Sequence, residues 1–97
     1  MALATLSSTH FYPGRIVMTH GVNDLVQRGV INPGLYLSRH LLGDWGDLCE
    51  EDRAINKAAV KHGDRLLSSY QVTTTIKLWI ITEWDRSVTT LLLPDEY

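Results

Sequence analysis

The segment at residues 76–83 constrains the fold more than any other, because apolar side chains alternate onto both of its faces. Leu78 and Ile80 point to one side of an extended chain, while Trp79 and Ile81 point to the other. A strand that is apolar on both faces belongs in the middle of a sheet. We therefore predict a central strand here, with helices packed against one face of the sheet.

The neighbouring segments alternate as well, which predicts three consecutive antiparallel strands with short connections. The first of them covers residues 65–72. The third covers residues 88–93 and ends before Pro94, which has no amide hydrogen for pairing. A separate short strand is predicted at residues 15–19, after a Pro-Gly turn.

Three helices are predicted between the short strand and these three strands. Apolar side chains recur at helical spacing in residues 20–28, in residues 33–42 and in the stretch that ends at residue 62. Thr19 and Asn32 have side chains that suit the N-caps of the first two helices. A glycine follows each of the three helices, where it can adopt the left-handed conformation that ends a helix.

The composition is sufficient for one compact core, since 44% of the 97 residues are hydrophobic. We predict a single α+β domain at residues 10–97, with a short N-terminal strand, three helices and a three-stranded antiparallel β-meander. Residues 1–9 are expected to form a flexible tail. The third helix is expected to place Ile55, Ala58, Ala59 and His62 on one side.

Charge and cysteine content narrow the functional classes. The net charge of -2 argues against a sequence-independent DNA or RNA binder, so no direct contact with nucleic acid is expected. The single cysteine, Cys49, excludes an internal disulfide framework and a thiolate-rich metal site. The chain contains no run of about 18 apolar residues, so no membrane-spanning helix is predicted. The first residues do not have the pattern of a secretory signal, so a cytoplasmic location is expected.

A glycine-punctuated turn at residues 43–52 is the most acidic part of the chain. Its five carboxylates belong to Asp44, Asp47, Glu50, Glu51 and Asp52. Asp47 and Glu50 have the spacing of a capping box, so Asp47 is predicted to cap the third helix and the acids after it to match the helix dipole. The helix that follows is basic, which suggests local charge pairing.

Two functional interpretations of this turn remain open beside the structural one. Asp44, Asp47 and Glu50 are hard oxygen ligands, but they lack the spacing of a calcium loop, and no metal site is predicted. The carboxylates also resemble a row of phosphates that competes for a basic groove on a partner. Trp45 either folds back as a lid over the core or stands out as an anchor for a partner.

The two-sided hydrophobicity of the meander is a second candidate for function. If helices cover the face with Leu78 and Ile80, the opposite face exposes more apolar surface than a monomer usually leaves in water. That opposite face is expected to carry Leu67, Trp79, Ile81 and Leu91. The pattern predicts self-association or a protein partner, unless the N-terminal strand and tail fold across the patch.

No catalytic centre is indicated. The histidines at positions 10, 20, 40 and 62 do not have the spacing of a zinc motif. Cys49 and a histidine form a conceivable dyad, but no oxyanion-hole signature lies nearby. Glu83, Asp85 and Arg86 form either an acid–base cluster like that of compact ribonucleases or, more simply, a surface ion pair at a β-turn.

A set of distinctive short motifs runs through the chain. They are Ser38-Arg39-His40, Gly43-Asp44-Trp45-Gly46-Asp47-Leu48, Glu51-Asp52, Asn56, Leu78-Trp79-Ile80-Ile81-Thr82-Glu83, Asp85-Arg86 and Leu92-Leu93-Pro94-Asp95-Glu96-Tyr97. Together they resemble a family of small plasmid-related proteins of bacterial plasmids and other mobile elements, over roughly residues 15–97. The resemblance implies a genetic setting and transfers no catalytic residue. Small, slightly acidic proteins of such elements resemble, in size and charge, inhibitors of host CRISPR or restriction systems.

The leading hypothesis is a non-enzymatic protein-binding module of a mobile element, an anti-CRISPR or anti-restriction factor whose partner is a host defence complex. Its predicted contact residues are Asp44, Trp45, Asp47, Glu50, Glu51, Trp79 and Ile81. One alternative is a small nuclease or toxin-like enzyme that uses His40 or His62 with Glu83 and Arg86. Another is a homodimeric structural module. No catalytic residue, metal or cofactor is predicted.

Overall fold

The computed structural model describes residues 9–97, and the predicted tail therefore lies outside the described residues except for Thr9. The elements in chain order are β1 (Arg15–Met18), α2 (His20–Gln27), α3 (Pro33–Leu41), α4 (Glu50–His62), β2 (Leu66–Gln71), β3 (Lys77–Thr82), β4 (Val88–Leu92) and the 3-10 helix η1 (Pro94–Glu96). The prediction of an α+β fold with three α-helices is confirmed.

The four strands form one mixed sheet in the order β1-β4-β3-β2, so the prediction of a purely antiparallel three-stranded meander is wrong. The neighbours β2, β3 and β4 are antiparallel, but β1 pairs with β4 in parallel. The amide of Arg15 donates to the carbonyl of Ser87, and that of Thr19 donates to Leu91, both at 3.0 Å. These bonds cover an edge of β4 that would otherwise be unpaired. The four residues of β1 contain no local sequence pattern that indicates which strand β1 pairs with.

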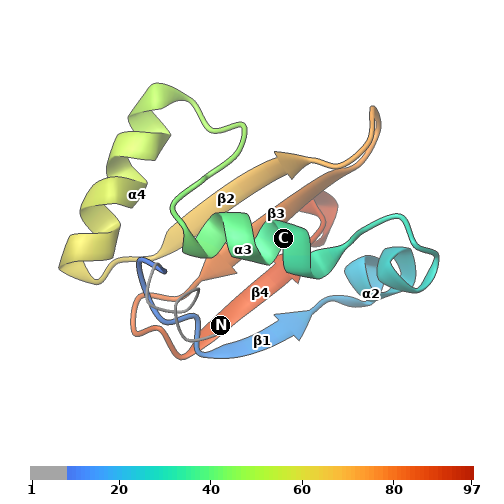
Figure 1. The fold of residues 1–97 in the computed structure, drawn as a ribbon, viewed down its shortest axis with the longest axis horizontal. Helices are drawn as coiled ribbons and strands as arrows, with labels where there is room; N and C mark the ends of the chain where they lie inside the picture. Colours follow the sequence, from blue (N-terminus) through green and yellow to red (C-terminus); the bar gives the residue numbers. More distant parts are fainter. Residues whose placement is uncertain (1–8) are drawn as a thin grey trace.

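One face of the sheet, which we call the covered face, packs against α2 and α3 (Figure 1). Its largest cluster of buried side chains comprises Val22, Ile31, Tyr70, Leu78, Ile80 and Leu91. The strand register places Leu91 opposite Ile80. The prediction that Leu91 lies on the other face is therefore wrong, and Leu92 lies there instead. The run of three leucines at the end of β4 hides the alternation that would have decided the register.

Helix α4 stands beside the edge of β2 and not over a face of the sheet (Figure 1). The side-chain amide of Asn56 donates to the carbonyl of Leu67 at 2.6 Å and accepts the amide of Leu67 at 3.3 Å. Ser69, two residues further along β2, donates to the carbonyl of Trp45 at 3.1 Å and accepts from the amide of Asp47 at 2.7 Å. The α4 helix and the acidic turn thus cover the edge of β2.

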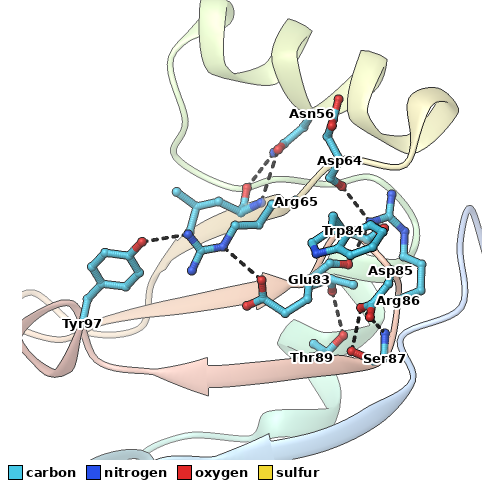
Figure 2. Close-up of polar contacts among 12 residues, drawn as sticks. Asn56, Asp64, Arg65, Glu83, Trp84, Asp85, Arg86, Ser87, Thr89 and Tyr97 are labelled. Carbon is cyan, nitrogen blue, oxygen red and sulfur yellow. Dashed lines mark hydrogen bonds and ion pairs between the residues drawn. The ribbon is translucent and has the colours of Figure 1, made fainter.

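Arg86 fixes the C-terminal end of α4 to the β3–β4 hairpin (Figure 2). Its guanidinium donates to the carbonyls of Ala59 at 3.0 Å, Asp64 at 2.7 Å, Glu83 at 3.0 Å and Trp84 at 3.3 Å. A cation at this position also meets the negative end of the α4 dipole. Arg86 is therefore a structural clamp, because both terminal nitrogens of its guanidinium donate to backbone carbonyls.

The helix caps agree with the sequence at two of three N-termini. Thr19 and Asn32 accept hydrogen bonds from the backbone of the first turn of α2 and α3. The predicted cap at Asp47 is wrong, because the N-cap of α4 is Cys49 and makes no side-chain capping bond. The backbone of Asp47 is instead used to pair with β2, so the helix begins later in the chain.

Candidate functional site

Trp45 lies in the core and not on the surface. Its side chain is 8% exposed and packs with Ala59 and Leu66. The ring stacks on Phe11 at 6.2 Å between centroids and meets the edge of His40 at 5.6 Å. This arrangement matches the lid interpretation of Trp45, because a partner would find almost none of its surface.

Asp44 also has a structural environment. Its carboxylate accepts a hydrogen bond of 2.6 Å from Nε of Arg39 and one of 3.2 Å from the amide of Gly46. The Arg39 hydrogen bond is the main reason that the pKa of Asp44 is lowered. The backbone carbonyl of Asp44 accepts the Tyr70 hydroxyl at 2.6 Å. Asp44 thus links α3 to β2, although half of its side chain stays exposed.

The other four acids of the turn face solvent. They are Asp47, Glu50, Glu51 and Asp52. Within residues 9–97 their carboxylates make no ion pair, so the predicted local pairing with the basic helix face does not form. The described part of the chain also holds no cluster of His, Cys, Asp or Glu that could bind a metal ion. These carboxylates therefore form an uncompensated acidic surface at the N-terminus of α4.

A groove of about 370 Å³ lies on the other face of the sheet, beside α4. We call it the Trp79 groove, and its apolar lining consists of Leu48, Ile55, Leu67, Trp79, Ile81 and Tyr97. Ile55 is 62% exposed and Tyr97 is 70% exposed, whereas Ile81 forms a buried floor. The structure thus brings the predicted contacts Trp79 and Ile81 to one site, with Asp52 of the acidic surface on its wall.

Arg65 and Tyr97 close one side of the Trp79 groove (Figure 2). Arg65 donates to the hydroxyl of Tyr97 at 2.8 Å, and its Nε lies 3.6 Å from the carboxylate of Glu83. The Tyr97 ring meets Trp79 edge to face at 5.8 Å. Because Glu83 offsets the charge of Arg65, the charge left on the groove wall is that of Asp52.

The apolar side predicted for the third helix is buried only in part. The buried residues of α4 are Asn56 and Ala59, while Ile55 and Ala58 are exposed. The helix faces a strand edge, whose peptide groups need hydrogen-bond partners more than apolar cover. The one sequence signal that this helix faces a strand edge was Asn56, an asparagine among the apolar positions.

The residues of the enzymatic alternative are not arranged as a catalytic site. His40 is fully buried, with Nδ1 2.5 Å from the Ser68 hydroxyl and Nε2 2.9 Å from that of Thr82. Burial lowers the pKa of His40 from 6.5 to about 3, and the charge of Arg86 adds to this effect. The imidazole is therefore neutral and sealed from solvent. His62 lies at the exposed end of α4.

No family model, curated protein or solved structure matches this chain. The resemblance to plasmid-related proteins therefore stays a prediction from the sequence motifs. In the described residues, no helix combines the length and the apolar character that crossing a membrane requires.

Proposed function

We propose that the protein is a non-enzymatic protein-binding module, and that the Trp79 groove receives a partner segment with an apolar anchor next to basic residues. The observation that carries this proposal is the exposure of Ile55 and Tyr97 around a groove whose floor is Ile81. Exposed apolar side chains that line a concave surface are typical of binding sites, and aromatic residues dominate binding energy at interfaces.

The charge around the groove supports a basic partner. Asp52 lies on the groove wall, and Asp47, Glu50 and Glu51 have no ion pair in residues 9–97. Arg65, the basic residue of the wall, is already paired with Glu83. A partner that brings lysine or arginine to this rim gains long-range attraction and faster association.

Protein surfaces that bind nucleic acid are one class of basic partner, because they neutralise phosphates with lysine and arginine. A small acidic protein that occupies such a surface competes with DNA or RNA for it, because phosphates and carboxylates seek the same cations. Together with the resemblance to plasmid-related proteins, this supports a role in the host cytoplasm as an anti-CRISPR or anti-restriction factor of a mobile element.

Titration of the purified protein against CRISPR effector and restriction complexes tests the proposal. Ile55→Arg places a charge in the apolar groove and adds a cation next to Asp52, so we expect at least about a tenfold loss of affinity. Ile16→Arg is the matched control, because Ile16 is 42% exposed and lies on the far edge strand β1. Absence of binding to both classes of complex, or equal losses in the two variants, contradicts the proposal.

A further inference from the structure

The outward side of α4 is a helix face without a packing partner. Of its 13 residues, Asn56 and Ala59 are buried. The side turned away from them carries Glu51, Ala54, Ala58 and Lys61, all of them exposed. These positions are three, four and three residues apart, which is the spacing of the seam along which two helices pack.

Charge is segregated along this face. The first turn of α4 contains acidic residues and the last turn contains Lys61 and His62. Glu51 and Lys61 are ten residues apart, or about 15 Å along the axis, so they cannot pair within one helix. Neither forms an ion pair within residues 9–97. Opposite charges at the two ends match the helix dipole, and they also make the face complementary to an antiparallel copy of itself.

A two-fold axis at the level of residue 56 generates a consistent set of contacts. It places Glu51 against Lys61 of a second copy and Ala54 against Ala58 of that copy, and each contact occurs twice. The small alanine side chains allow the helix axes to approach to about 8 Å. A groove of about 820 Å³ lies along the same face and is walled by Lys57 and Lys61, so it provides room and positive charge for the acidic end of the second helix.

We propose that two copies of this chain associate through antiparallel α4 helices. A second copy suits this face better than an acidic or a basic partner would, because either of those would match the charge of one end of the helix and oppose that of the other. The Trp79 groove lies on the other flank of α4, lined by Ile55 and Asp52. The dimer therefore presents two such grooves, and its existence does not depend on what they bind.

Sedimentation equilibrium of charge-reversal variants tests this dimer. Glu51→Lys and Lys61→Glu each place like charges at both symmetric contacts, so each is expected to weaken dimerisation about tenfold. The double variant Glu51→Lys/Lys61→Glu restores opposite charges in the reverse order and is expected to return to within about threefold of the wild type. Circular dichroism confirms that the variants are folded, which is expected because both residues are exposed.

Three outcomes of the sedimentation experiments overturn the proposal. One is a wild-type protein that stays monomeric up to about 1 mM. Another is a dimer that neither single reversal weakens. The third is a folded double variant that does not recover. For the wild type alone, amide chemical shifts that change on dilution must lie on α4. Chemical-shift changes confined to β3, the strand with Trp79, would contradict the proposal by assigning the dimer to the sheet face. Because this measurement uses the wild type, it decides the question even if a variant fails to fold.

Discussion

The two faces of the sheet differ in what covers them. The covered face buries Leu78 and Ile80 completely under α2 and α3. The other face presents Trp79 and Ile81 to a groove bordered by α4 and Tyr97. Strand β3 is apolar on both sides, yet one side alone is used to build the main core. The first apolar side supplies most of the core, and the second lines a groove in which Ile81 is buried while Ile55 and Tyr97 are exposed.

The first prediction compares a buried tryptophan with an exposed one, and it concerns the greatest change in stability. Trp45→Ala removes a side chain that is 8% exposed and should cost about 3–5 kcal/mol of unfolding free energy. Trp84→Ala is the matched control, because Trp84 is 66% exposed on the β3–β4 hairpin and should change stability by less than about 0.5 kcal/mol. Urea denaturation measures both. Equal losses of unfolding free energy in the two variants would contradict the assignment of Trp45 to the core and Trp84 to the surface.

The second prediction concerns the pH dependence of stability that arises from His40, which is buried against Ser68 and Thr82 of the covered face. The pKa of His40 is about 3 in the folded protein and 6.5 when exposed, so between these values the unfolded state binds more protons. Stability is therefore full above pH 6.5 and falls as the pH decreases, by about 2 kcal/mol at pH 5. The lowered pKa values of Asp44, Asp85 and Glu96 act in the same direction, but only at more acidic pH.

Urea denaturation between pH 5 and 7 measures this dependence. His40→Gln should flatten it. His62→Gln serves as the matched control, because it removes an exposed imidazole and leaves His40 in place. A slope that persists in His40→Gln, or that disappears in His62→Gln, would show that the buried imidazole is not its source.

The third prediction concerns the clamp between α4 and the hairpin. Arg86→Lys keeps the charge but loses the planar fork that reaches the carbonyls of Ala59 and Asp64, so we expect a loss of about 1–2 kcal/mol. Arg28→Lys is the control, because Arg28 makes an exposed ion pair with Asp24 and should change little. Thermal unfolding compares the two, and a loss in Arg86→Lys no larger than that in Arg28→Lys would mean that a positive charge suffices at position 86 without the guanidinium fork.

The smallest effect on stability is expected at the Trp79 groove. Ile55→Ser should change the unfolding free energy by less than about 0.5 kcal/mol, because Ile55 is 62% exposed. The same variant should reduce binding of a partner, which would separate the role of the open face from that of the covered face. A cost similar to that of Trp45→Ala would show that Ile55 belongs to the core.

Most errors in the sequence-based predictions arise from contacts between residues far apart in the chain, whereas the wrong face for Leu91 reflects the run of leucines at the end of β4. Helix ends were predicted well where the signal is a neighbouring residue, as with the caps Thr19 and Asn32. Asp47 has the same local signal, but its backbone is occupied by pairing with Ser69. Long-range contacts of this kind cannot be read from spacing. Trp79 and Ile81 were assigned to a common surface from alternation alone, whereas the contributions of Arg65 and Tyr97 to the groove depend on where α4 and the last residues lie.

Local sequence patterns were enough to predict the three helices, the strand segments and the two-sided hydrophobicity of β3, because periodicity and capping are properties of residues a few positions apart. The folded structure established that β1 completes the sheet beside β4, and that Trp45 lies in the core and not on a contact surface. It also decided that α4 covers a strand edge and leaves both of its flanks hollow. These outcomes depend on which buried peptide groups and apolar surfaces find partners across the whole chain, and only the assembled fold satisfies them together.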